Sequence, residues 1–152
     1  MLKTKSIAGV LLTGLALIIF LGAFSELSAP EKEGIQWLSF EEALKKNKKD
    51  PKMILIDVYT DWCGYCKKMD KNTFQDKEVI EYVNKNFHPV KLDAESGNNY
   101  SYKGNEYSSK KLVKGVFHVR GYPTTVYLNS SNDLLSVVPG YHSATKFNLL
   151  NK

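Results

Sequence analysis

Two cysteines, Cys63 and Cys66, are the only ones in the chain of 152 residues, and they have the spacing C-x-x-C. A structural zinc ion takes about four ligands, usually from a second C-x-x-C pair or from two closely spaced histidines. The sequence contains neither. The chemistry that remains for two thiols at this spacing is to form and break a disulfide with each other. We therefore interpret the pair as redox-active.

The local context gives the two cysteines different tasks. They follow a strand-like run, Met53–Tyr59, and stand at the start of a segment compatible with a helix. Unpaired N–H groups and the helix dipole stabilise a thiolate at a helix N-terminus. We expect this position to lower the pKa of the Cys63 thiol below about 8.5, which makes Cys63 the attacking nucleophile. Cys66, one turn further along, would attack the resulting mixed disulfide and release the substrate.

Asp57 interrupts an otherwise apolar strand shortly before the cysteines. A carboxylate inside such a run is costly unless it is paired or used. Two interpretations remain open: Asp57 accepts the proton of Cys66, or it is a strand-end residue bonded to a nearby backbone group or lysine. We favour the proton acceptor. Lys67 and Lys68 follow the pair, and we expect them to form a solvated helix face.

These residues resemble the thioredoxin superfamily. Its pattern is an acid on the central strand, then Trp-Cys-x-x-Cys-Lys, and far downstream a cis-proline that faces the disulfide. The matching residues are Asp57, Trp62, Cys63, Cys66, Lys67 and, downstream, Pro123. The continuation from Cys66 to Phe74 is similar to the bacterial extracytoplasmic branch, which includes the C-terminal domain of the transmembrane disulfide reductase.

The resemblance implies a thioredoxin-like α/β fold, with a central mixed sheet flanked by helices on both faces. It implies a protein-disulfide oxidoreductase that needs no bound cofactor besides its own redox-active disulfide, Cys63–Cys66. The residues expected to bind the substrate around that disulfide are Trp62, Gly64, Tyr65, Tyr122 and Pro123. A cis bond before Pro123 would place the Tyr122 backbone beside the cysteines, where it pairs with an extended substrate segment.

The direction of the reaction stays open at this point. The Gly64-Tyr65 pair between the cysteines differs from the Gly-Pro of cytosolic thioredoxins and also occurs in periplasmic disulfide isomerases. We favour a reductase. The alternatives are an oxidase or isomerase with the same chemistry, and a non-enzymatic carrier that holds Cu(I) between its thiols. Pro123 and the lack of a third ligand argue against the carrier. We assign no metal ligand, and expect surface or boundary positions for His88, His118 and His142.

The N-terminus is typical of a targeting segment. Lys3 and Lys5 precede an uncharged apolar run, Ile7–Phe24. We expect this run to be a cleaved signal peptide or, if uncleaved, a membrane anchor. Either places the rest of the chain outside the cytoplasm, in the periplasm or cell envelope. An exported reductase must be recharged because its compartment is oxidising, so the expected partners are disulfide-containing proteins and a transmembrane electron donor.

Length and charge indicate one domain. After a leader, residues 1–25, and a polar tether, residues 26–36, the stretch 37–152 is near the usual size of a single core. The formal net charge is +5. Without the two leader lysines it is +3, from 19 basic and 16 acidic residues. This balance is too mild, and too scattered, to indicate nucleic-acid binding.

The remaining pattern predicts the elements that position the cysteines. They are a helix from a Ser39–Glu42 capping box to about residue 46, strand 53–59, helix 63–72, a helix after Asp76, strand 87–92, a short helix 109–116, strands 124–128 and 134–138, and a helix from about 143.

A segment at about 95–108 is longer than in a minimal thioredoxin. Gly104-Asn105 predicts a hairpin with a two-residue turn. Its tyrosines are Tyr100, Tyr102 and Tyr107. They form either an exposed surface that touches a partner or the packing of the hairpin itself.

Overall fold

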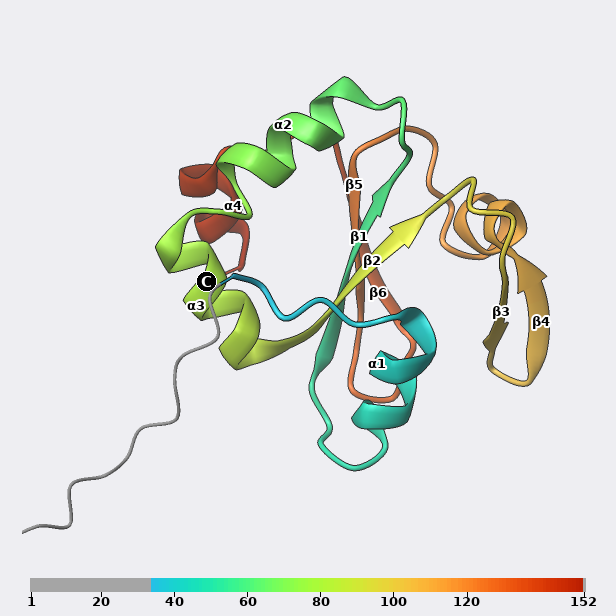
Figure 1. Ribbon diagram of the computed structural model, residues 1–152. Coiled ribbons are helices and arrows are strands. Elements are labelled where there is room, and N and C mark those ends of the chain that lie inside the picture. Colours follow the sequence, from blue (N-terminus) through green and yellow to red (C-terminus); the bar gives the residue numbers. More distant parts are fainter. Residues whose placement is uncertain (1–33, 152) are drawn as a thin grey trace, which may run out of the picture. The chain divides into compact units, whose positions relative to one another are not determined.

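The computed structural model describes residues 34–151 (Figure 1). The predicted leader and the tether up to residue 33 lie outside this range. In chain order the elements are α1 (Phe40–Asn47), β1 (Met53–Tyr59), α2 (Gly64–Asn72), α3 (Lys77–Asn86), β2 (Phe87–Asp93), β3 (Asn99–Tyr102), β4 (Asn105–Ser108), η1 (Lys111–Val116), β5 (Thr124–Leu128), β6 (Leu134–Pro139) and α4 (Ala144–Asn151). None of the helices in residues 34–151 has the length and apolar character needed to cross a bilayer.

The centre of the fold is a mixed sheet of four strands in the order β2-β1-β5-β6. Strand β1 pairs in parallel with β2 and antiparallel with β5, and β6 pairs antiparallel with β5. Residues 54–58 of β1 are all buried because β1 lies inside the sheet and both of its faces are covered. The predicted mixed sheet and the bounds of this strand are confirmed.

The two faces of the sheet carry different helices. Ile54, Ile56 and Val58 pack with side chains of α1, of the β3–β4 hairpin and of η1, whereas Leu55 packs with side chains of α2, α3 and α4. Figure 1 shows these two groups on opposite sides of the sheet. Because side chains alternate along a strand, Asp57 points to the same face as Leu55, toward α2.

Helix starts follow the predicted caps. The Glu42 N–H donates to Ser39 Oγ at 3.2 Å and the Ser39 N–H donates to Glu42 Oε2 at 2.9 Å, which forms the expected capping box at α1. At α3 the Val79 N–H donates to Asp76 Oδ1 at 3.1 Å. Both helix starts are therefore confirmed.

The predicted hairpin is present, but its turn is one residue earlier than expected. Tyr102 lies opposite Asn105, so the turn residues are Lys103 and Gly104, with φ angles of 50° and 77°. Such angles favour glycine or asparagine in a two-residue turn. Lys103 is held there because its Nζ pairs with Asp133 and lies 5.8 Å from the centroid of the Tyr102 ring.

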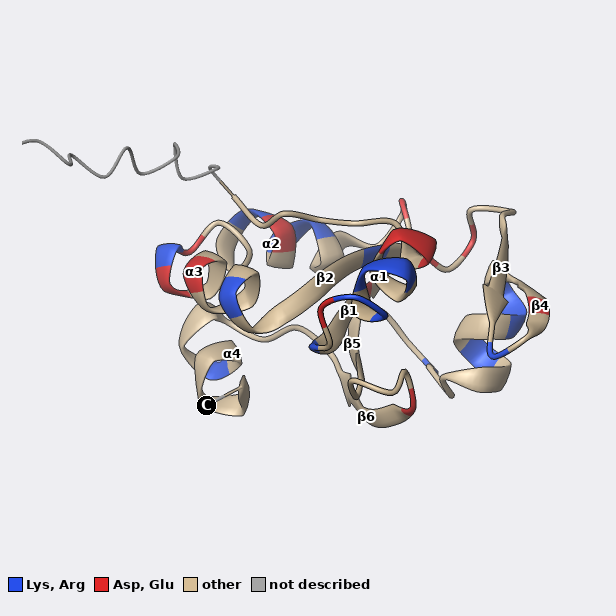
Figure 2. Cartoon of the chain, turned by 90° about the horizontal axis from the view of Figure 1, so that it is seen from below, with Lys and Arg blue, Asp and Glu red and all other residues tan. Residues whose placement is uncertain are grey.

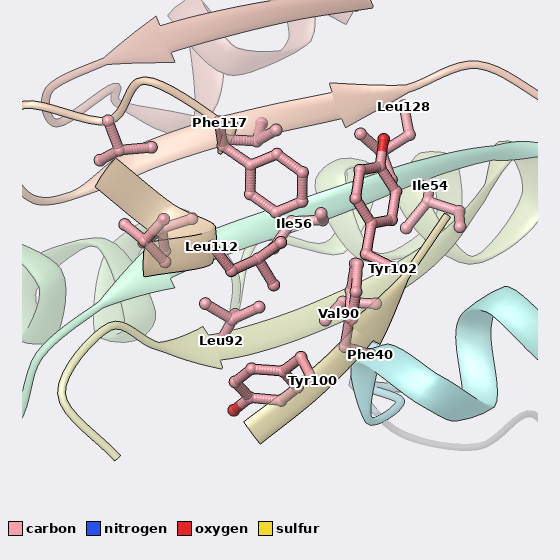
Figure 3. Packing of buried hydrophobic residues seen from close by; sticks show 14 of the residues in the cluster. Phe40, Ile54, Ile56, Val90, Leu92, Tyr100, Tyr102, Leu112, Phe117 and Leu128 are labelled. Atoms are coloured by element: carbon pink, nitrogen blue, oxygen red, sulfur yellow. The ribbon is translucent and has the colours of Figure 1, made fainter. Parts of the chain in front are cut away.

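The hairpin tyrosines belong to the main core. The Tyr100 and Tyr102 rings are buried, and each lies 5.9 Å from the Phe40 ring centroid (Figure 3). The Tyr102 ring also contacts Phe117 at 5.5 Å, and its hydroxyl donates to the Asn132 carbonyl at 2.6 Å. The exposed aromatic surface is therefore wrong for these two tyrosines, because alternation along β3 turns both toward the sheet.

The short helix predicted at 109–116 is a single π-helical segment. The Phe117 N–H donates to the Leu112 carbonyl, five residues earlier, at 2.9 Å. Leu112 and Val113 are buried against the sheet, and Lys111 and Lys114 are exposed. Single π-helical turns are rare and are often found next to functional sites.

The burial difference between the hairpin tyrosines generates a test of the fold. Tyr102→Ala removes a buried aromatic ring, so we expect it to lower the free energy of unfolding by about 3–5 kcal/mol. Tyr107 is half-buried, and Tyr107→Ala is expected to cost about 1 kcal/mol. Urea denaturation of the two oxidised variants and the unchanged chain measures both values. Equal losses would contradict the packing of Tyr102 in the core.

Candidate active site

The Cys63–Cys66 disulfide lies at the start of α2, just after the turn that follows β1. Cys63 is the N-cap residue of α2, and the two Cα atoms are 5.3 Å apart. The Cys66 N–H donates to Cys63 Sγ at 3.1 Å. The sulfur of Cys63 therefore occupies the position at which side-chain acceptors satisfy the free N–H groups of a helix start, as the sequence predicts.

Backbone hydrogen bonds fix Cys63 on both sides. Its N–H donates to the Thr60 carbonyl at 3.1 Å, which closes the turn after β1. Its carbonyl accepts from the Lys67 N–H at 3.2 Å, the first bond of the helix. The side chain is 5% exposed and that of Cys66 is 3% exposed. The nucleophile is thus held by backbone hydrogen bonds, nearly buried, at the start of the helix.

Asp57 is buried on β1 beneath α2, with 2% of its surface exposed. Its Oδ2 lies 3.2 Å from Lys91 Nζ, and its Oδ1 has no hydrogen-bond partner in the described part of the chain. Burial raises the pKa of Asp57 from 3.8 to about 6; Lys91 opposes this rise and Asp70 adds to it. Asp57 is therefore bonded to a lysine, as one of the two interpretations expected. Its role as proton acceptor stays a prediction.

Lys91 links two carboxylates and three elements. It lies in β2, directly opposite Asp57 of β1, and its Nζ also pairs with Asp70 of α2. Burial lowers the pKa of Lys91, but the two carboxylates outweigh it and the net pKa is raised. The Nζ atom lies 4.9 Å from the Tyr59 ring centroid and 5.4 Å from that of Trp37.

Sequence reasoning missed Lys91 and Asp70. A signal for Lys91 existed, because a charged residue inside an apolar strand is as unusual in β2 as Asp57 is in β1. Nothing in the sequence indicated that Asp70 belongs to the site, because it lies on α2 among other charged residues (Figure 2).

Trp62 and Tyr122 form an aromatic pair beside the disulfide. The Trp62 ring is 68% exposed and meets the Tyr122 ring edge-on, with centroids 6.0 Å apart. Its indole N–H donates to Glu95 Oε2 at 2.9 Å. The Tyr122–Pro123 bond is cis, as the resemblance implies. Glu95 was not predicted, since it lies in the chain just after β2, far from Trp62.

Tyr65 forms a second aromatic contact at the site. Its ring is 64% exposed and lies 6.4 Å from the Tyr141 ring, over which Lys68 Nζ is placed at 5.0 Å. Gly64 is open to solvent, and a methyl group there would meet no atom within 4 Å. Of the predicted substrate-binding residues, Trp62, Tyr65 and Tyr122 therefore offer aromatic side chains around the disulfide.

The histidines take no part in this site. His118 is exposed, as expected, but His88 and His142 are 1% and 7% exposed, so the predicted surface or boundary position is wrong for them. The His88 ring is accommodated because its Nε2 lies 2.7 Å from the Asp50 carbonyl oxygen. Within residues 34–151, no three His, Cys, Asp or Glu side chains lie together in a way that would hold a metal ion.

Because the pKa of Asp57 is raised, replacing this residue should increase the stability of the fold by an amount that depends on pH. The folded state binds this proton more tightly than the unfolded state, so the carboxylate destabilises the fold increasingly as pH rises from about 4 to 6. We expect Asp57→Asn to raise the free energy of unfolding by about 1–3 kcal/mol near pH 7.5 and by little near pH 4. Urea denaturation of the oxidised proteins measures this difference.

Asp61→Asn is the matched control, because Asp61 is an exposed aspartate beside the same site. It should change stability by less than about 0.5 kcal/mol at both pH values. An Asp57→Asn effect that does not vary with pH would show that the carboxylate is not desolvated.

Comparison with known proteins places these features in a family. The model of the thioredoxin-like domain matches residues 40–151. The chain is 31% identical over 114 residues to the thiol:disulfide interchange protein DsbD of Photorhabdus laumondii, over 74% of this chain and 18% of that protein. It is 28% identical over 103 residues to the disulfide bond reductase DsbH of Chlamydia pneumoniae, over 67% of this chain and 61% of that protein.

A solved structure agrees with these matches. The putative disulphide-isomerase of Bacteroides thetaiotaomicron has a TM-score of 0.58 and 33% identity, over 76% of this chain and 88% of that chain. The chain spans under a fifth of the DsbD relative and about three fifths of the DsbH relative. Because the family match extends over most of the sequence, the chain belongs to the family of thioredoxin-like domains.

Proposed function

We propose that this protein reduces protein disulfides outside the cytoplasm through its Cys63–Cys66 pair. The observation that carries the proposal is the position of Cys63 at the N-cap of α2, where its Sγ accepts the Cys66 N–H at 3.1 Å. After reduction, the same N–H and the positive end of the helix dipole favour the thiolate over the thiol. The thiolate is the form that attacks disulfides.

The first step of the proposed reaction is attack by the Cys63 thiolate on one sulfur of a substrate disulfide. The substrate S–S bond breaks, a mixed disulfide forms, and one substrate sulfur leaves as a thiolate that takes a proton from water. In the second step the Cys66 thiol gives its proton to Asp57 and its sulfur attacks Cys63 Sγ. The bond between Cys63 and the substrate breaks, the Cys63–Cys66 disulfide forms, and the second substrate sulfur leaves as a thiolate that takes a proton from water. Two electrons have then moved from the cysteine pair to the substrate.

Asp57 suits the role of proton acceptor in this second step. With a pKa of about 6, its carboxyl is mostly ionised at neutral pH and still binds a proton far more readily than an exposed aspartate does. Lys91 occupies only Oδ2, and Oδ1 has no partner among residues 34–151. This atom is the one we assign to the proton of Cys66.

Substrate binding is assigned to the aromatic side chains and the backbone beside the disulfide. Trp62 and Tyr65 expose most of their rings, which offers apolar contact area at little entropic cost. The Tyr122 backbone before cis-Pro123 is proposed to pair with an extended substrate segment, as a strand added to an edge.

Reduction of successive substrates requires a source of electrons. We propose that a transmembrane dithiol donor transfers two electrons to the Cys63–Cys66 disulfide, so that no bound cofactor is needed. The apolar run at 7–24 supports export, as a leader or anchor. The names of the DsbD and DsbH relatives support the reaction class, and the name of the isomerase relative keeps the other direction as an outcome of the tests below.

Substitution of each cysteine tests the order of attack. Cys63→Ser is expected to reduce insulin disulfides at the background rate, because the nucleophile is gone. Cys66→Ser is expected to accumulate a mixed disulfide with the substrate, detectable by mass spectrometry, because nothing resolves it. If instead Cys63→Ser accumulated the mixed disulfide and Cys66→Ser did not, Cys66 would be the attacking cysteine and Cys63 the resolving one.

The reduction potential of the pair tests the direction. A value near about −270 mV against glutathione is expected for a reductase, and a value near about −120 mV would instead make the protein an oxidant or isomerase. A reduced protein that forms no intramolecular disulfide under these conditions would favour the Cu(I) carrier.

A further inference from the structure

A pocket of about 310 Å³ lies next to Tyr122, outside the redox pair itself. Its walls come from three residues after β2, from Ser108 at the end of β4 and the two residues that follow it, and from Lys114 of η1. We propose that it binds an acidic side chain of the substrate, and so selects target cysteines that have Asp or Glu close to them. The inference rests on the proposed function, because it names the class of substrate for that site.

Two lysines give the pocket its charge. Lys110 and Lys114 line it and are exposed, and within residues 34–151 the salt bridges include neither of them. Figure 2 shows basic segments in the short helix beside β3 and β4. Glu95 also lines the pocket, but its carboxylate already accepts the indole N–H of Trp62. Glu95 keeps its negative charge, so the two lysines and this carboxylate leave one net positive charge in the lining, and the lysine ammonium groups can donate to an incoming carboxylate.

Hydrogen bonds hold the pocket walls together. Ser96 Oγ lies 2.7 Å from Ser109 Oγ, and the Ser109 N–H donates to the Asn98 carbonyl at 2.9 Å. Ser109 Oγ is itself 3.1 Å from the same carbonyl. These contacts join the segment after β2 to the start of the π-helix across the base of the hairpin, so the two lysines are presented by a preformed wall.

The pocket is within reach of a segment bound at the cysteines. Tyr122 lines it and directly precedes Pro123, and the Tyr122 ring lies 6.0 Å from that of Trp62, the neighbour of Cys63. An extended substrate segment that pairs with the Tyr122 backbone would therefore pass the pocket, advancing about 3.4 Å per residue. The side chains concerned are those within about three residues of the substrate cysteine.

The test uses the reduced full chain and two model peptide disulfides that differ only in having Glu or Lys at the second and third positions from each cysteine. In about 0.01 M salt we expect the Glu peptide to be reduced about three- to ten-fold faster than the Lys peptide. In about 1 M salt the ratio should approach one. Lys110→Glu/Lys114→Glu should abolish or invert the preference, and Lys110→Gln/Lys114→Gln should abolish it.

Lys45→Glu/Lys49→Glu is the matched control. These exposed lysines lie at and just after the end of α1, four residues apart as Lys110 and Lys114 are, and their reversal changes the net charge equally. The control should keep the preference for the Glu peptide. Loss of the preference in both double reversals would assign it to net charge and overturn the pocket.

A second measurement separates the pocket from the chemistry. A Glu peptide with Ser in place of each Cys is titrated into the oxidised chain, and amide chemical shifts are followed by NMR. Shifts centred on Gly97, Lys110 and Tyr122 support the pocket, and their absence overturns it. If the unchanged chain reduces neither disulfide peptide, the proposed function fails, and this titration alone still decides whether the pocket binds acidic side chains.

Discussion

One ammonium group, that of Lys91, sets the electrostatics of the site. It pairs with both Asp57 in the core and Asp70 on α2, and so ties β1, β2 and α2 together beneath the disulfide. Burial raises the pKa of Asp57, the neighbouring Asp70 carboxylate raises it further, and the Lys91 ammonium lowers it. Together these effects leave the pKa of Asp57 at about 6, a value at which a carboxyl can exchange protons near neutral pH.

The hairpin connects the core to the surface next to this site. Tyr100 and Tyr102 bury its inner face against Phe40 and the sheet, so the insertion adds to the core of the domain. Its base then forms part of the wall of the lysine pocket through Ser109. The hairpin thus packs into the core through β3 and contributes to the pocket wall through the end of β4.

Local patterns were enough to predict most of the fold, because the strands are short apolar runs and the helices begin at recognisable caps. They also located Cys63, Cys66 and Asp57, whose residue types are unusual where they occur. They did not locate Asp70 or Glu95, because those partners meet the site only through tertiary pairing. The alternation in β3 placed both tyrosines on one face, but sequence alone did not show that this face meets Phe40.

The hairpin is fastened at its tip as well as at its base: Tyr102 donates to the Asn132 carbonyl and Lys103 pairs with Asp133. These contacts at the tip hold the hairpin without using the residues of the pocket wall, so the residues that keep the fold differ from those that can vary. Lys110 and Lys114 of the pocket wall are exposed and belong neither to these anchoring contacts nor to the redox pair. Descendants of this chain could therefore acquire new target preferences through a few surface substitutions while the sulfur chemistry stays unchanged.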